Sequence, residues 1–174
     1  GLSHGKGTDV LFDALKLIGD KVDWHLSLFG NVDKKFEYIQ WLEEPLLSRR
    51  VTLMGIASQD ELAEQYSKSD LYIVSSRVET ANVSMLEAMA CGIPVVSTRC
   101  GAPETLLDDS VSITVPSENP KAMAEAILTM SNTIGDYKKE ELREFVIRNY
   151  SKKAVADKMI NAYQNAIDKT NQVE

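Results

Sequence analysis

Short apolar runs alternate with longer amphipathic segments along the chain, and this alternation restricts the available folds more than any other feature. The runs that predict strands occupy residues 24–29, 51–54, 70–75, 93–97 and 111–115. Most of them are apolar throughout instead of alternating in polarity, which is typical of buried parallel strands. The order of elements therefore predicts an α/β fold, a doubly wound parallel sheet with helices on both faces.

The segments between the strands carry helix signals. Thr8 or Asp9 is expected to cap the first helix. Ser58 and Glu61 form a Ser-x-x-Glu capping box, and Asn119 precedes a proline suited to a first helical turn. Expected helices cover about 9–18, 33–46, 59–67, 104–107, 120–128, 140–148 and 152–167, and another begins within 81–84.

Composition indicates one domain over residues 1–174. A hydrophobic fraction of 44% is enough for a sizeable core. The net charge of -7 argues against binding nucleic acid through a broad basic face. Since no run has the length of a membrane span and no leader opens the chain, we expect a cytoplasmic protein. Cys91 and Cys100 are expected to be reduced core cysteines, and no metal site is expected.

Two carboxylates stand out in the stretch 79–94. Glu79 is expected at the carboxyl end of a strand, whereas Glu87 lies among the apolar residues of the helix that follows. A charge inside a core costs on the order of several kcal/mol unless a polar group meets it, so Glu87 is predicted to be functional. The alternatives are an ordinary surface acid at Glu79 and an acid paired with a structural arginine or amide at Glu87.

Lys6 lies between Gly5 and Gly7, directly before the first helix. A cation at that end opposes the helix dipole by about 0.3–1 kcal/mol, and a bound anion would reverse this penalty. Glycines also let backbone amides approach a phosphate, so the loop is predicted to hold a pyrophosphate. It matches neither the P-loop nor the dinucleotide fingerprint, and the alternative is a solvated lysine.

The helix start at 81–84 offers free amides for the same anion. Ligands of parallel α/β sheets bind at the carboxyl ends of the strands, where both loops are expected. Glu87 would then accept hydrogen bonds from vicinal ribose hydroxyls, and Glu79 would contact a sugar.

Three features of the sequence belong together. They are Lys6-Gly7, the glycines Gly30 and Gly55, and Glu-x7-Glu followed by Ala-Met-Ala-Cys-Gly-Ile-Pro-Val-Val at 88–96. Together they resemble the carboxyl-terminal half of a retaining glycosyltransferase of family four, with the GT-B fold. The resemblance covers nearly the whole chain and implies a site for a nucleotide-diphosphate sugar. The catalytic acids it implies are Glu79 and Glu87. The donor-binding residues it implies are Lys6, Gly7, Asn82, Val83, Ser84, Glu87 and Glu104.

The resemblance also implies a mechanism. Lys6 would hold the diphosphate, Glu87 the ribose and Glu79 the hydroxyls of the transferred sugar. The anomeric configuration would be retained by front-face displacement, in which the leaving diphosphate helps to deprotonate the acceptor. No metal or other cofactor is implied. The donor would be a UDP- or GDP-sugar, and the pathway polysaccharide or glycoconjugate assembly.

Two departures from the family pattern affect what is expected. Ala81 and Asn82 replace an aromatic residue and a glycine, and asparagine tolerates a left-handed turn. The family's domain also begins with a strand that ends in a basic residue before Lys-Gly. We therefore expect a fragment that lacks this strand and the acceptor-binding half, binds poorly and is inactive alone. Its helix at 150–174 would pack toward the missing half. The acceptor would be a glycan or glycolipid, with peripheral membrane association of the full protein.

Three other interpretations stay open at this point. One is a nucleotide-sugar epimerase of the same two-domain architecture, which explains Glu-x7-Glu less well. Another is a flavodoxin-like regulatory domain, which would need aspartates at the ends of its early strands, whereas these strands end in Gly30 and Gly55. The third is a structural domain that packs through its last helix.

Overall fold

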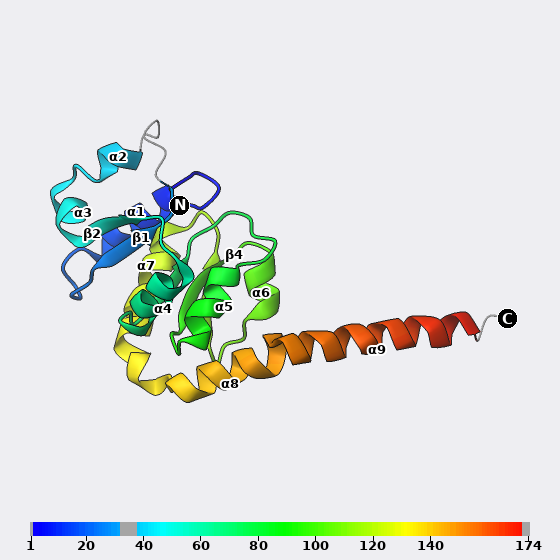
Figure 1. Cartoon of the computed structure of the whole chain (residues 1–174). Helices are drawn as coiled ribbons and strands as arrows, with labels where there is room; N and C mark the ends of the chain where they lie inside the picture. The colour runs from blue at the N-terminus through cyan, green and yellow to red at the C-terminus, as the bar shows by residue number, and fades with distance from the viewer. Residues whose placement is uncertain (1, 32–37, 172–174) are drawn as a thin grey trace.

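The computed structural model, which describes residues 2–31 and 38–171, is an α/β fold with a long helix at its carboxyl end (Figure 1). The strands are β1 (Leu26–Phe29), β2 (Val51–Gly55), β3 (Tyr72–Val74), β4 (Val95–Arg99) and β5 (Ser112–Pro116). The helices are α1 (Thr8–Ile18), α2 (Tyr38–Trp41), α3 (Pro45–Arg50), α4 (Gln59–Ser67), α5 (Val83–Ala90), α6 (Ala102–Leu106), α7 (Pro120–Thr133), the 3-10 helix η1 (Ile134–Asp136), α8 (Lys139–Tyr150) and α9 (Lys152–Asn171).

All pairs of neighbouring strands are parallel, as predicted, but the strands form two sheets instead of one. One sheet has the order β1-β2, and the other has the order β3-β4-β5. Within the described residues, β1 and β3 each have a single strand neighbour. Each of these two strands therefore presents an edge that no strand of the described chain covers.

Helices cover both faces of the larger sheet, and β4 shows this most clearly. Successive side chains of a strand point to opposite faces. Val96 belongs to a core cluster with Phe12 of α1 and Met123 of α7, whereas Val95 belongs to a cluster with Met89 of α5 and residues of α8. Residues of β1 pack against the first cluster as well, so α1 and α7 join the two sheets into one core. The predicted doubly wound arrangement is confirmed on this point.

The smaller sheet corrects one expectation. The run 51–54 was predicted to be a buried strand, and it does form β2. However, β2 has β1 as its only strand neighbour among the described residues, and Leu53 and Met54 are 38% and 41% exposed. An apolar run indicates a strand without indicating whether both of its faces are covered.

Local signals set several helix boundaries. The capping box is present at the start of α4, where Ser58 Oγ accepts from Glu61 N and Glu61 Oε2 accepts from Ser58 N. The helix predicted over 33–46 is wrong in its described part, because α2 and α3 are separate helices. Pro45 begins α3, a position at which a proline loses no hydrogen bond. Residues 32–37 lie outside the described residues.

Helix α9 extends away from the rest of the fold after contacting α8 (Figure 1). The helix predicted over 152–167 is confirmed, while residues 172–174 lie outside the described residues. Its apolar stripe is exposed: Val155, Met159, Tyr163 and Ile167 are 42–63% accessible. What this stripe packs against stays a prediction. None of the helices in the described part of the chain is long and apolar enough to cross a membrane.

Candidate functional site

The amino-terminal loop lies directly on the carboxyl end of β3, and Gly7 makes this contact possible. Gly7 has φ 60, and a Cβ atom built on it would lie 1.9 Å from the carbonyl oxygen of Ser75. The Ser75 hydroxyl also donates to the carbonyl of Lys6 at 2.8 Å. The missing side chain of Gly7 and the hydroxyl of Ser75 thus bring the Lys6 backbone to the carboxyl end of β3, as predicted.

The loop that follows β3 is held against the loop that follows β4. Glu79 N donates to the carbonyl of Cys100 at 2.7 Å, and Ala102 N donates to the carbonyl of Glu79 at 2.9 Å. These bonds form an isolated parallel bridge between Glu79 and Gly101. The backbone of Glu79 is therefore fixed on both sides, which limits where its carboxylate can lie.

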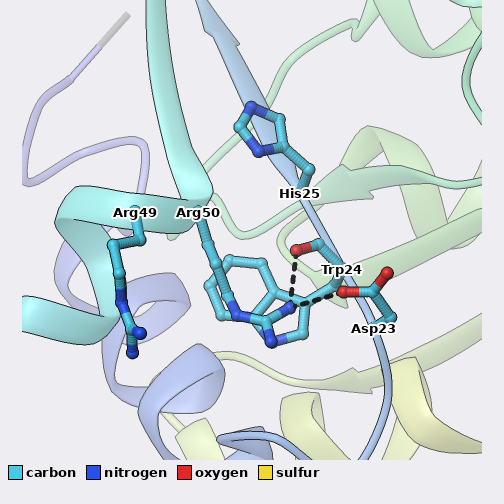
Figure 2. Close-up of a pocket in the computed structure, with 5 residues that line it drawn as sticks. All are labelled: Asp23, Trp24, His25, Arg49 and Arg50. Atoms are coloured by element: carbon cyan, nitrogen blue, oxygen red, sulfur yellow. Dashed lines mark hydrogen bonds and ion pairs between the residues drawn. The ribbon is translucent and has the colours of Figure 1, made fainter.

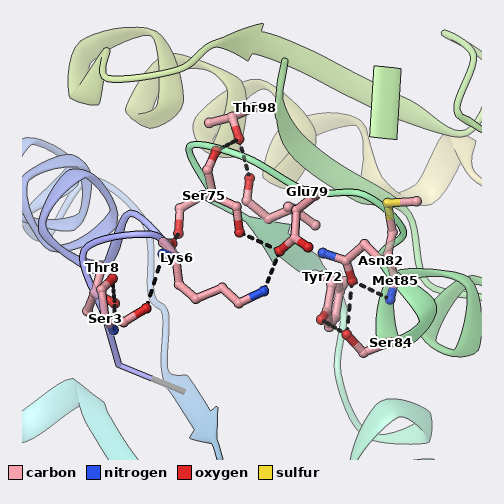
Figure 3. A network of polar contacts seen from close by, with 12 residues as sticks. Ser3, Lys6, Thr8, Tyr72, Ser75, Glu79, Asn82, Ser84, Met85 and Thr98 are labelled. Atoms are coloured by element: carbon pink, nitrogen blue, oxygen red, sulfur yellow. Dashed lines mark hydrogen bonds and ion pairs between the residues drawn. The ribbon is translucent and has the colours of Figure 1, made fainter. Parts of the chain in front are cut away.

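Lys6 and Glu79 form an ion pair at this point (Figure 3). Lys6 Nζ lies 2.6 Å from Glu79 Oε1, which also accepts from Ser76 Oγ at 2.7 Å. The Glu79 side chain is 9% exposed and that of Lys6 is 50% exposed. The alternative of an ordinary surface acid at Glu79 is therefore wrong. Because an ammonium has three donors and this one is half exposed, Lys6 can contact an anion while it remains bound to Glu79.

The start of α5 lies beside this pair (Figure 3). Asn82 caps the helix, since its Oδ1 accepts from Met85 N at 3.1 Å. Ser84 Oγ donates to the same oxygen at 3.0 Å, so the Tyr72 hydroxyl, 2.8 Å from Ser84 Oγ, is the donor in that contact. Burial raises the pKa of Tyr72, which keeps this donor protonated. Asn82 has φ -101, so the expected left-handed turn is not used there.

Glu87 differs from the prediction of a charge surrounded by core residues. Its neighbours Ala88 and Met89 are fully buried, but Glu87 itself is half-buried and reaches solvent. Within residues 2–31 and 38–171 its carboxylate makes no hydrogen bond and no ion pair, so no structural arginine holds it. Burial raises the pKa of the Tyr66 and Tyr72 hydroxyls, and the nearby charge of Glu87 adds to both shifts. The acid is thus available to a ligand, without the full cost of burial.

Val83 and Glu104 are the remaining predicted residues, and both are exposed to solvent. Val83 is the first residue of α5 and is 61% exposed. Glu104 lies in the first turn of α6, which follows the Gly101 bridge. Burial raises the pKa of the Cys100 thiol, and the charges of Glu79 and Glu104 contribute to this shift, which places both acids near Cys100. The structure therefore brings all the predicted residues to one end of the larger sheet.

Sequence reasoning missed the residues that hold this site together. Arg77 binds both oxygens of Asp9, at 2.8 Å and 2.7 Å, and this contact lowers the pKa of Asp9. Thr98 donates to the carbonyl of Ser76 at 2.5 Å. Arg77 and Asp9 are 68 residues apart, and nothing in a single sequence pairs them. The sequence contains one indication that Arg77 belongs to the site, which is its position two residues before Glu79.

A separate hollow lies at the opposite ends of the strands (Figure 2). It has a volume of about 510 Å³ and is lined by Asp23, Trp24, His25, Arg49 and Arg50. These residues directly precede β1 and β2. Arg50 already donates to Asp20, to Asp23 and to the carbonyl of Trp24. The hollow is thus distinct from the Lys6–Glu79 site. Its more buried cation, Arg50, is already hydrogen-bonded within the protein.

The chemistry of the candidate site follows from its charges. An exposed ammonium and a helix start attract an anion such as a phosphate. Two partly accessible carboxylates, those of Glu79 and Glu87, accept hydrogen bonds from hydroxyl groups. Among the described residues, no group of three or more His, Cys, Asp or Glu side chains is placed to hold a metal ion. The site therefore suits a ligand that carries both phosphate and hydroxyl groups.

Comparison with known proteins gives consistent matches. A family model described as glycosyl transferases group 1 matches residues 1–133. An uncharacterised glycosyltransferase of Methanocaldococcus jannaschii is 31% identical over 147 residues, which cover 80% of this chain and 40% of that protein. Sucrose-phosphate synthase of Thermosynechococcus elongatus has a TM-score of 0.79 at 24% identity, over 96% of this chain and 44% of that one. HepE of Anabaena, solved in complex with UDP, has a TM-score of 0.80 at 20% identity, over 94% and 46%.

These matches agree on fold and extent. The two solved structures are glycosyltransferases of the GT-B class, whose domains are Rossmann-like, so the predicted fold class is confirmed. The chain fits the carboxyl-terminal domain of that architecture. It spans 40%, 44% and 38% of the length of three curated relatives that it matches, or about two fifths.

The contact between Gly7 and Ser75 predicts a large effect on stability. Gly7→Ala adds a Cβ atom where no space exists and forces a left-handed residue, so the free energy of unfolding should fall by about 3 kcal/mol or more. Gly5→Ala is the matched control, because nothing lies within 4 Å of its added Cβ. Urea unfolding measures both. Equal losses in the two variants would contradict the close approach.

The Asp9–Arg77 contact predicts a pH dependence. The pKa of Asp9 is lowered in the folded state, so its contribution to stability is present above the unfolded pKa, about 3.9, and disappears as pH falls through the folded value. The loss of stability caused by Asp9→Asn should be largest near neutral pH and should shrink below about pH 4. Asp23→Asn, at an exposed surface pair, is the control and should change little. A loss for Asp9→Asn that stays constant down to pH 2 would contradict this assignment.

Proposed function

The chain belongs to the group 1 glycosyl transferases, and we propose that it binds the nucleotide-diphosphate sugar for a retaining glycosyltransferase. The observation that carries this proposal is the Lys6–Glu79 pair beside the start of α5. A diphosphate needs a cation and free amides, and a sugar needs acceptors for its hydroxyls. The pair and its surroundings supply all of these at the carboxyl ends of parallel strands, where ligands of such sheets bind.

Lys6 and the first turn of α5 hold the diphosphate in this proposal. The amides of Val83 and Ser84 are among those that a helix start leaves without intrahelical acceptors. The Met85 amide is already used by the Asn82 cap, which leaves the two preceding amides to face a phosphate. Negative charge grows on the diphosphate as the bond between the anomeric carbon and the phosphate oxygen breaks. Contacts from Lys6 and these amides therefore stabilise the leaving group in the transition state.

Glu87 and Glu79 bind hydroxyl groups. The Glu87 carboxylate is half-buried and suits the vicinal hydroxyls of the ribose. At Glu79 the ion pair and the serine contact both use Oε1, so the other oxygen remains for hydroxyls of the transferred sugar. Glu104 lies at the rim of the site and makes a peripheral contact with the donor.

The reaction needs more than this domain. The acceptor hydroxyl attacks the anomeric carbon on the face from which the diphosphate leaves, and the departing phosphate oxygen takes the hydroxyl proton. The chain spans about two fifths of its relatives, so the acceptor site, for a glycan or a glycolipid, belongs to another part of the enzyme. We expect no turnover by this chain alone and no metal requirement. The exposed stripe of α9 would pack toward that other part.

Titration with nucleotides tests the donor site. HepE, which shares the fold, was solved with UDP, so UDP is the first probe, followed by GDP and ADP. Backbone amide signals of residues 5–8 and 82–87 should shift. Lys6→Ala should weaken UDP binding about tenfold or more, because it removes a charge-assisted hydrogen bond. Glu87→Gln should weaken binding of every nucleotide through the shared ribose.

Lys68→Ala is the matched control for Lys6→Ala, because Lys68 is an exposed lysine that pairs with Glu64 in α4. Its UDP affinity should be unchanged. Absence of shifts with any nucleotide at millimolar concentration would count against the proposal, as would shifts confined to the hollow around Arg50.

The role of Glu79 is separable from that of Lys6 by comparing UDP with UDP-glucose. Glu79→Gln keeps an oxygen for Lys6 but removes the charge that orders sugar hydroxyls. It should leave the affinity for UDP within about twofold and should reduce any additional affinity for UDP-glucose severalfold. Calorimetry measures both ligands. Equal weakening of the two would contradict the assignment of Glu79 to the sugar.

A further inference from the structure

We propose that Arg77 is a positioning residue for the donor site, which holds the loop of Lys6 at the distance from Glu79 that donor binding requires. This inference rests on the proposed function. Arg77 itself is not expected to contact the donor.

Arg77 binds the backbone on the amino-terminal side of Lys6. Its Nη1 donates to the carbonyl of His4 at 2.5 Å, and its backbone N donates to the carbonyl of Gly5 at 3.0 Å. Lys6 is flanked by glycines, which have the widest choice of backbone conformations. A loop of this composition needs outside contacts to keep a single conformation, and Arg77 supplies two of them.

The guanidinium is itself held from two other directions. It makes a bidentate contact with Asp9 in the first turn of α1, and its Nε donates to Glu118 Oε1 at 2.7 Å. The planar fork of arginine suits this geometry, whereas the ammonium of a lysine does not reproduce it. With 17% of the side chain exposed, Arg77 joins the loop, α1 and the segment before α7 into one unit.

The charges around Arg77 argue against direct phosphate binding. Two carboxylates, those of Asp9 and Glu118, already contact the guanidinium and offset its charge. Lys6 is the cation that remains half exposed in this part of the described structure. Arg77 therefore acts through Lys6 and not in place of it.

Arg77 lies in the same short segment of the chain as Ser75 and Glu79, which also contact Lys6. The segment 75–79 binds the Lys6 loop through Ser75 and Arg77 and binds the Lys6 ammonium through Glu79. The backbone and the side chain of Lys6 are thus both attached to one short segment. Replacing the Arg77 side chain removes its contacts with the His4 carbonyl and with Asp9, while the backbone bond to Gly5 remains. The backbone that carries Lys6 then gains freedom, although the ammonium stays attached to Glu79.

A double-mutant cycle tests whether Arg77 acts through Lys6. The affinity for UDP is measured by calorimetry in the wild-type chain, Arg77→Gln, Lys6→Ala and the double variant. Arg77→Gln should weaken binding about three- to tenfold in the wild-type background and less than about twofold once Lys6 is absent. Amide signals of residues 5–7 should broaden or shift in Arg77→Gln without ligand.

Arg50→Gln is the matched control. Arg50 is 22% exposed and donates to two aspartates and a carbonyl, but at the amino ends of the strands. Its loss should leave UDP affinity within about twofold. Arg77→Lys is a second variant, which keeps the charge. It should also weaken UDP binding in the wild-type background, and this loss should likewise fall below about twofold once Lys6 is absent.

The outcomes are distinct. Equal weakening by Arg77→Gln with and without Lys6 would show a merely structural role and overturn the inference, while the donor-site proposal would stand on Lys6→Ala. Unchanged affinity in both Arg77 variants would also overturn it. If the wild-type chain bound no UDP at millimolar concentration, both the donor-site proposal and this inference would fall.

Discussion

The candidate site depends on the close approach of Gly7 to the carbonyl of Ser75. No side chain fits between these two backbones, because an added Cβ atom would lie 1.9 Å from the oxygen. This contact seats the amino-terminal loop on the end of β3. The ion pair of Lys6 with Glu79 and the contacts of Arg77 with the loop follow from it, since they all join the same two segments. A backbone constraint thus sets the electrostatics of the site.

The strands are divided into two sheets close to the segment that carries Lys6 in the order of the fold. The loop that carries Lys6 rests on the end of β3, and α1, which follows this loop, leads to β1. Within the described residues, β1 pairs with β2 and β3 pairs with β4, so the sheet is divided between these two groups of strands. The shared core of α1 and α7 holds the two sheets together despite the break.

The sequence predicted the elements well where the signal was local. The capping box of Ser58 and the helix start at Asn119 each act within a few residues. It failed where the answer depends on a partner distant in the chain. The exposure of β2 and the accessibility of Glu87 are set by what packs beside them, and Arg77 meets an aspartate 68 residues away. Periodicity identifies a face of an element but not what covers that face.

The negative charge of the chain explains why the placement of Lys6 matters at the candidate site. The chain has a net charge of -7, so its overall field repels a diphosphate at long range. Lys6, the cation that we propose binds the ligand, is moreover partly neutralised by Glu79. In the proposed donor site, affinity would then come from short contacts made by one ammonium and a few amides, and such contacts weaken steeply when their geometry is lost. A site of this kind depends less on the number of its charges than on the residues that hold one lysine in place.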